Sequence, residues 1–204
     1  MTPTRVLRVD PRVPSATALG AAADVIAQKG VVAFPTETFY GLGAAALEPE
    51  SVRRIFEIKG RPESKPLLVL VDSIGMAESL VEEIPSHAWA LIDRHWPGPL
   101  TLVLRARPGV PAGVTAGTGT VGIRMSSHPV AIGLVRAAGT PVTAPSANPS
   151  GGAPPTSAER VLANFDGAID LMLDGGPTAG GPASTVVDLT VDPPQVLRPG
   201  AVAL

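Results

Sequence analysis

Apolar residues follow two patterns along this chain, one spaced as on a helix face and one in short continuous runs. Helical spacing over 15–30 predicts a helix that Ser15 can cap and Gly30 can end. The other segments with helical spacing are 49–60, 73–80, 86–95, 129–139 and 157–165. Short apolar runs predict buried strands at 31–34, 66–71, 100–106, 120–125, 140–144, 168–176, 184–190 and 194–200.

The order of these elements indicates the fold class. Helices and strands alternate, and in several places two strands follow each other directly. This order predicts an α/β fold with an open sheet of mixed parallel and antiparallel strands. The 204 residues can bury a substantial core, so we expect one domain that spans 1–204.

Composition excludes several kinds of chemistry. The chain has no cysteine, which rules out disulfides, thiol nucleophiles and cysteine-bound metals. Its three histidines are scattered and form no zinc-binding motif. No apolar run approaches the ~20 residues that a membrane span needs, and the first residues lack the apolar stretch of a signal peptide. We therefore expect a soluble, cytoplasmic protein with no membrane partner.

Charge is distributed unevenly along the chain. The net charge is −2, which does not suit a protein that coats nucleic acid. Between Arg94 and Ala158, however, there is no acidic residue, while the same stretch holds several arginines. A long segment free of carboxylates is what an anion-binding face requires, although chance explains it equally well in a chain with 17% charged residues.

The usual phosphate-binding motifs do not account for an anion site. A Walker-type loop is absent from the sequence. Gly117, Gly119 and Gly122 satisfy the GxGxxG pattern, but a strand follows them where a dinucleotide site needs a helix. The glycines therefore predict a hairpin or loop.

The inward stripe of the helix predicted over 49–60 ends in a lysine. Lys59 lies on the same helical face as Val52 and Ile55, so it continues the core-facing side as a cation. Arg61 follows directly after the glycine that stops the helix. One interpretation is a lysine that reaches water at a helix C-terminus. The other is a pair of cations held by rigid backbone for a phosphate chain.

Polar side chains at three strand ends have a similar ambiguity. Ser146 and Asn148 follow a buried strand, where they can form a turn or face a ligand. Arg124 interrupts an apolar strand and needs an anion, either a substrate carboxylate or a structural one such as Asp188. Arg198 ends the last strand with the same two possibilities.

With these segments in view, the sequence resembles the YrdC-type family of threonylcarbamoyl-AMP synthases. The matching segments are "FPTETFYGLGAAA", "IFEIKGRPESKPLLVLV", "HWPGPLTLVL", "VGIRMSSHP", "APSANPSGG", "ASTVVDL" and "VLRPGAV". They extend from about residue 16 to the C-terminus in the family's order. The resemblance implies a twisted open sheet with flanking helices around a concave, positively charged cavity. It also implies the short, single-domain form of the family.

The activity implied by the resemblance is a nucleotidyltransferase reaction. Such an enzyme condenses L-threonine, bicarbonate or CO2 and ATP into threonylcarbamoyl-AMP and pyrophosphate. The product feeds the N6-threonylcarbamoyl modification of an adenosine in certain tRNAs through a separate transferase complex, and contact with tRNA or double-stranded RNA is possible. ATP is expected with Mg2+ as a substrate complex and no cofactor is expected to be permanently bound, because no carboxylate cluster for a metal is evident.

The resemblance assigns site residues position by position. Lys59 and Arg61 match the family's KxR motif and are the implied catalytic pair, and Ser146 and Asn148 match its SxN motif. The implied ATP contacts are Lys59, Arg61, Thr120, Ser146, Asn148 and Arg198. The implied threonine contacts are Thr36, Arg124 and Ser184, with Arg124 on the carboxylate. No residue stands out as a general base.

One departure and two alternatives accompany this resemblance. Leu70 stands where many members have a histidine, which affects the threonine pocket. A carbamoyl-adenylate-forming domain of the same fold is one alternative, although such domains usually lie in longer chains with further modules. The other is a non-enzymatic module that binds double-stranded RNA or tRNA, against which the net negative charge and the 3% aromatic content argue.

Overall fold

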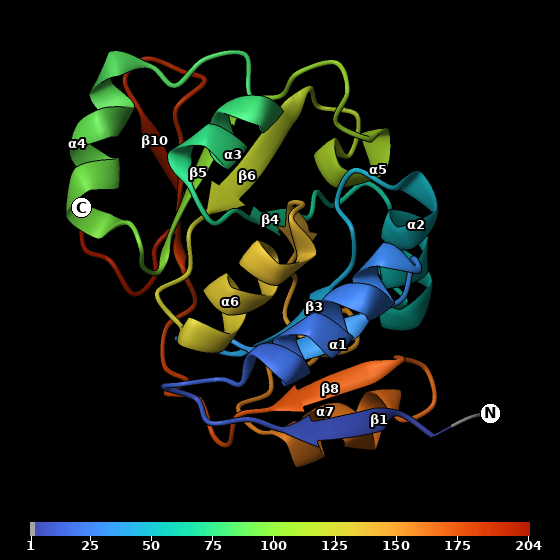
Figure 1. Ribbon diagram of the computed structural model, residues 1–204. Helices are drawn as coiled ribbons and strands as arrows, with labels where there is room; N and C mark the ends of the chain where they lie inside the picture. The colour runs from blue at the N-terminus through green and yellow to red at the C-terminus, as the bar shows by residue number, and fades with distance from the viewer. Residues whose placement is uncertain (1–2) are drawn as a thin grey trace.

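The computed structural model describes residues 3–204 and contains two mixed β-sheets with helices packed against them (Figure 1). The helices are α1 (Ala16–Ala27), α2 (Pro49–Lys59), α3 (Ile74–Leu80), α4 (Ser86–His95), α5 (Ala112–Thr115), α6 (Pro129–Ala138) and α7 (Ala158–Phe165). The strands are β1 (Arg5–Arg8), β2 (Val32–Pro35), β3 (Tyr40–Gly43), β4 (Leu68–Leu70), β5 (Leu100–Arg105), β6 (Thr120–Arg124), β7 (Val142–Thr143), β8 (Leu171–Asp174), β9 (Thr185–Asp188) and β10 (Gln195–Arg198).

The strands are divided between a four-stranded and a six-stranded sheet. Their orders are β1-β8-β2-β3 and β10-β9-β5-β6-β4-β7, and each sheet combines parallel with antiparallel pairs. Isolated bridges between Ala45 and Val142 and between Gly41 and Ser146 join the edge strands β3 and β7. The prediction of an α/β fold with mixed strands is therefore confirmed, with two linked sheets in place of one.

Two hydrophobic clusters hold the layers together. Helices α1 and α6 pack against each other in Figure 1 and cover β2 and β8, where Ile26, Phe34, Leu134 and Leu171 are fully or almost fully buried. A larger cluster extends from α2 across β4, β5 and β6. None of the helices in residues 3–204 combines the length and apolar character that a bilayer span requires.

Three elements escaped the sequence prediction. Strand β3 contains two glycines in four residues, yet it pairs with β2 over its whole length because the hairpin closes locally. Strand β1 carries exposed arginines at both ends and is held by parallel pairing to the distant β8. Helix α5 is a single turn, too short for periodicity to reveal.

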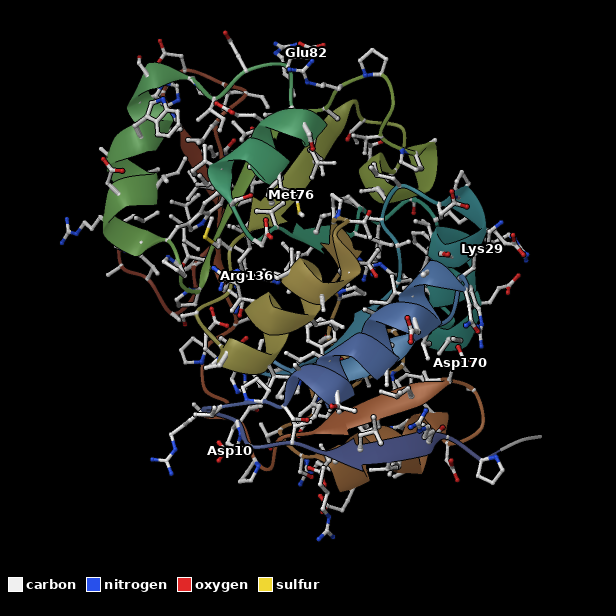
Figure 2. The ribbon with its side chains drawn as sticks, in the orientation of Figure 1. Asp10, Lys29, Met76, Glu82, Arg136 and Asp170 are labelled. Carbon is white, nitrogen blue, oxygen red and sulfur yellow. The ribbon has the colours of Figure 1, made fainter. Side chains whose placement is uncertain are left out.

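The end of α1 differs from the prediction. Ser15 caps its start as expected, but Gln28 closes the helix and Lys29, not Gly30, adopts the left-handed conformation with φ 63°. Gly30 is needed for space instead, because a Cβ there would lie 2.5 Å from Val25 Cγ1. Lys29 lies on the outside of the molecule (Figure 2), with its Nζ 2.9 Å from Glu50 Oε2.

Candidate active site

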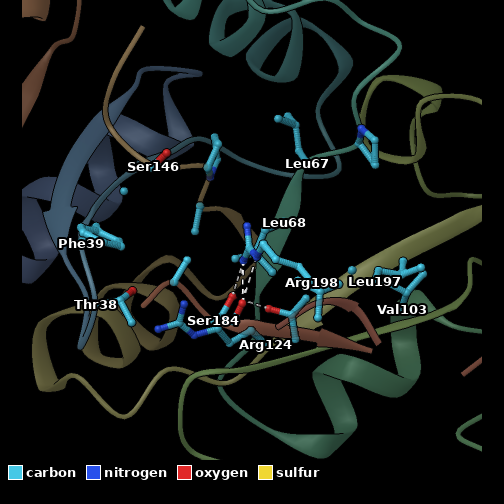
Figure 3. Close-up of a pocket in the computed structure, with 18 of the residues that line it drawn as sticks. Thr38, Phe39, Leu67, Leu68, Val103, Arg124, Ser146, Ser184, Leu197 and Arg198 are labelled. Carbon is cyan, nitrogen blue, oxygen red and sulfur yellow. Dashed lines mark hydrogen bonds between the residues drawn. The ribbon is translucent and has the colours of Figure 1, made fainter. Parts of the chain in front are cut away.

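A cavity of about 510 Å³ opens where the two sheets meet (Figure 3). Its walls come from the β2–β3 loop, the segment between α2 and β4, strands β5, β6 and β9, the segment after β7, and the end of β10. Seven of the nine residues expected from the sequence line this cavity: Thr36, Arg61, Thr120, Arg124, Ser146, Ser184 and Arg198. Lys59 and Asn148 lie behind its wall and are 3% and 6% exposed.

Lys59 fastens the loop after β7. The glycine after it adopts a left-handed conformation and ends α2, as predicted, so that the last helical side chain turns inward. Its Nζ donates hydrogen bonds to the carbonyl oxygens of Ser146 and Asn148, while Ser150 N donates to the Lys59 carbonyl at 2.8 Å. Burial, together with the nearby charge of Arg61, lowers the pKa of Lys59 to about 8.

Arg61 and Asn148 differ in how they relate to the cavity. Arg61 lines it, and its Nη2 is anchored 2.8 Å from the carbonyl oxygen of Pro66, shortly before β4. Asn148 instead shapes its own loop, since its Nδ2 donates to the carbonyls of Pro149 and Gly152 at 2.8 Å. The Asn148 side chain therefore fixes the loop that follows Ser146 and is not among the residues that line the cavity.

A buried ion pair stands at the other end of the cavity. Arg124 is 3% exposed, and its Nη2 lies 2.7 Å from Glu37 Oε2. The pair is close, yet Arg124 Nε and Nη2 have no aligned hydrogen-bond acceptor among the described residues. The prediction that Asp188 is the structural anion for Arg124 is wrong, because Arg124 pairs with Glu37. Asp188 Oδ1 instead accepts hydrogen bonds from Thr190 N and Thr190 Oγ1.

Glu37 is a residue that sequence reasoning missed. Its carboxylate accepts hydrogen bonds from Ser126 Oγ and from Ser127 N, so it connects the β2–β3 loop to the segment after β6. Burial opposes its ionisation, but the charge of the closely placed Arg124 and the hydrogen bond from Ser126 outweigh burial and hold the pKa of Glu37 below its ordinary value. Its place between the two threonines of "PTET" was the one available indication.

Arg198 and Ser184 form a second fixed contact, marked by dashed lines in Figure 3. Arg198 Nε and Nη2 donate to the Ser184 carbonyl at 3.1 and 2.8 Å, and Nη2 also donates to Ser184 Oγ at 2.9 Å. Burial, followed by the neighbouring charge of Arg124, lowers the pKa of Arg198. The charges of Arg124 and Arg198 are therefore close enough to interact.

Thr120 faces the cavity with a hydroxyl that can only accept. Thr118 Oγ1 lies 2.6 Å from the Thr115 carbonyl, so its single hydrogen is used there. The 2.9 Å contact between the two hydroxyls then requires Thr120 to donate to Thr118. A ligand group at Thr120 must accordingly be a donor. The loop before it, with Gly117 and Gly119 at positive φ, leads into β6 antiparallel to β5, which confirms the predicted hairpin or loop.

The position of Arg198 depends on a close backbone approach at Gly200. A Cβ at Gly200 would lie 2.2 Å from the Ala183 carbonyl oxygen and 2.7 Å from Thr185 N. Gly200→Ala should therefore push the chain end away from β9 and lower the melting temperature by about 5 °C. Gly109→Ala, where a Cβ meets nothing within 4 Å, is the matched control. Equal melting curves for both variants would contradict this account.

Charge around the cavity is mixed. Three arginines line it, together with the carboxylate of Asp188, while Glu37 lies behind Arg124. The stretch without acidic residues seen in the sequence therefore does not produce a wall without carboxylates, because β9 and the β2–β3 loop supply them. Three or more histidines, aspartates and glutamates do not gather as a metal site anywhere in residues 3–204.

Comparisons with known proteins agree with this architecture. A family model named Sua5/yciO/yrdC and described as "Telomere recombination" matches residues 24–200. The threonylcarbamoyl-AMP synthase of Pyrococcus abyssi is 50% identical over 183 residues, which are 90% of this chain and 54% of that protein. The Bacillus subtilis protein of the same name is 46% identical over 194 residues, or 95% of this chain and 54% of that protein.

A solved structure extends the comparison to three dimensions. The crystal structure of P. abyssi Sua5 complexed with L-threonine matches with a TM-score of 0.93 and 47% identity, over 97% of this chain and 58% of that one. This chain thus spans about half the length of the curated relatives named above.

Proposed function

This chain belongs to the Sua5/yciO/yrdC family, and from that premise we propose that it is an L-threonylcarbamoyladenylate synthase. The amine nitrogen of L-threonine bonds to the carbon of CO2, supplied by bicarbonate, and loses a proton, which gives a carbamate. A carbamate oxygen then bonds to the α-phosphorus of ATP while the bond to the β-phosphate breaks. The products are threonylcarbamoyl-AMP and pyrophosphate.

The observation that carries this proposal is the meeting of three arginines in one cavity. Arg61, Arg124 and Arg198 come from distant segments, and each is held in place by a carbonyl or carboxylate oxygen of the protein. Guanidinium groups fixed in this way suit anionic ligands with several phosphates and a carboxylate. Because the reaction asks for little covalent chemistry from the protein, such positioning and charge balance can account for catalysis.

We assign the two ends of the cavity to different parts of the substrates. Arg61 and Ser146 bind the triphosphate, with Lys59 and Asn148 holding the loop that presents Ser146, and Arg198 adds charge near the phosphates. Thr120 accepts from a ribose hydroxyl or from the adenine amine, since its own hydrogen is used by Thr118.

The amino-acid end lies at the buried ion pair. Arg124 lines the cavity and binds the threonine carboxylate, while Glu37 Oε2, 2.7 Å from Arg124 Nη2, holds the guanidinium in place. Thr36 and Ser184 complete the wall of the threonine pocket. Arg124 and Ser184 are both in place before any ligand binds, because Glu37 holds the first and Arg198 the second.

Mg2+ fits this site only as a companion of ATP. Asp188 is the one carboxylate among the residues that line the described cavity, whereas a dedicated metal site needs several oxygen ligands. ATP-bound Mg2+ would neutralise phosphate charge, and Asp188 would contact the hydration shell of the ion. The product would be consumed by a separate transferase that modifies tRNA; direct tRNA contact and the cytoplasmic location stay predictions.

The test is mass spectrometry of the product formed from ATP, bicarbonate and L-threonine. We expect a threonylcarbamoyl-AMP mass and stoichiometric pyrophosphate, and neither when threonine is omitted. Arg61→Ala should lower the rate by about 10²–10³-fold. Arg53→Ala, which removes an exposed arginine paired with Glu57 on the outer face of α2, should not.

Two outcomes would contradict the proposal. Pyrophosphate release that requires carbamoyl phosphate and ignores threonine would indicate a carbamoyl-adenylate activity. Salt-sensitive binding of double-stranded RNA without any turnover would indicate the RNA-binding module.

A further inference from the structure

Two threonine hydroxyls in the β2–β3 loop have unequal hydrogen-bonding capacity. From this difference we propose that Thr38, and not Thr36, supplies the hydrogen-bond acceptor that recognises a donor group of L-threonine, its amine or its β-hydroxyl. The proposal rests on the proposed function, because it assumes that threonine is the ligand at this end of the cavity.

The hydroxyl of Thr36 is fully used inside the protein. Its Oγ1 lies 2.7 Å from the Phe39 carbonyl oxygen, and two oxygens approach so closely only with a hydrogen between them, which Thr36 alone can provide. The same oxygen accepts from Thr38 N at 3.2 Å and from Phe39 N at 3.3 Å. Thr36 Oγ1 has spent its only hydrogen on Phe39, and its lone pairs are shared among the two amides and the Thr38 hydroxyl, so Thr36 acts as the internal support of the loop and has no hydrogen for a ligand.

The hydroxyl of Thr38, in contrast, keeps lone pairs that can accept a hydrogen bond from a ligand. The 3.1 Å contact between the two hydroxyls requires Thr38 to donate, because the hydrogen of Thr36 is already used. Its Oγ1 keeps its lone pairs, and its side chain lines the cavity, where it is labelled in Figure 3. An oxygen that only accepts binds an ammonium or a hydroxyl and cannot donate to a carboxylate or a phosphate.

The position of Thr38 places this acceptor beside the carboxylate site. The preceding residue, Glu37, forms the ion pair with Arg124, so the loop that backs the carboxylate-binding arginine also carries the acceptor. A threonine whose carboxylate lies on Arg124 has its amine and its hydroxyl one and two carbons away. Both are donors, and both are within the reach of the neighbouring side chain.

The experiment compares hydroxyl-retaining and hydroxyl-free variants with two amino acids. Thr38→Val removes the acceptor at constant shape and Thr38→Ser keeps it, while Thr36→Val serves as the loop-support variant. L-Threonine and L-2-aminobutyrate, which lacks the β-hydroxyl, are the ligands. Calorimetric affinity for each amino acid, KM for ATP, kcat and the melting temperature are measured. Thr38→Ala replaces Thr38→Val if the latter does not fold.

We expect Thr38→Val to weaken threonine binding about tenfold, with KM for ATP unchanged and Thr38→Ser close to wild type. An equal loss for both amino acids identifies the amine as the donor. A loss confined to threonine identifies the β-hydroxyl. Thr36→Val should mainly lower the melting temperature.

Two results would overturn the assignment of Thr38. One is unchanged threonine affinity in Thr38→Val. The other is a parallel loss for threonine and ATP with a lower melting temperature, which a purely structural role produces. Either result with an active wild-type protein rejects only this inference, whereas a wild type that makes no threonylcarbamoyl-AMP rejects the proposed function itself.

Discussion

Arg124→Leu should abolish threonine-dependent turnover and lower the free energy of unfolding by about 3 kcal/mol. The activity is lost because Arg124 is the only fully buried arginine among residues 3–204, so the carboxylate of the substrate loses its buried guanidinium. The stability is lost because Glu37, whose side chain is 17% exposed, keeps a charge without its partner. Chemical denaturation and the product assay measure the two effects separately.

The double variant Glu37→Leu/Arg124→Leu is the informative control. Removing both charges replaces the ion pair by apolar contacts, which is often neutral for stability. We expect the double variant to regain most of the lost stability and still to form no product. If Arg124→Leu is as stable as wild type, or if the double variant is active, the ion pair does not have the role described.

Lys59→Met should lower turnover by about 10²–10³-fold, with a larger effect on KM for ATP than on KM for threonine. The methionine fills a similar volume but cannot donate to the carbonyls of Ser146 and Asn148, so the loop that presents the Ser146 hydroxyl is no longer fixed. Lys65→Met, an exposed lysine in the same segment, is the matched control. Equal activity of the two variants would refute the role of Lys59.

The lowered pKa of Lys59 adds a pH dependence to this prediction. As pH rises through about 8, the folded protein loses the ammonium charge near the phosphates, so kcat/KM for ATP should fall. Stability should change in the opposite direction, because between pH 8 and the ordinary value of 10.5 the unfolded chain binds the proton that the folded protein has lost. Both trends should be absent from Lys59→Met in rate profiles and denaturation curves.

Helix α2 illustrates how far local patterns predict this protein. Val52, Ile55 and Lys59 lie on its buried face, and Gly60 ends it at φ 56°, as the sequence indicated. Helical periodicity and the freedom of glycine act over a few residues, so they can be read directly from the chain. The same is true of Ser15, whose side chain caps α1.

Local patterns did not predict the whole site. Because the β2–β3 hairpin was not predicted, the role of Glu37 and the contrast between Thr36 and Thr38 in its loop were missed as well. The sequence indicated that Arg124 needs an anion. It could not identify Glu37 as the partner, because 86 residues separate the two in the chain and no local pattern connects them. Asp188, the partner suggested from the sequence, belongs to β9, which β5 separates from β6, and it has its own donors.

Residue types and their periodicity alone determined every helix except the single turn α5, most strands, the mixed α/β class and the inward direction of Lys59. Only the tertiary structure decided which charge faces which, and which hydroxyl donates. Both depend on distances of about 3 Å between segments far apart in the chain, and a hydroxyl has one hydrogen whose direction is settled by its nearest acceptor. For this reason the arginines could be named from the sequence, while the acceptor at Thr38 could not.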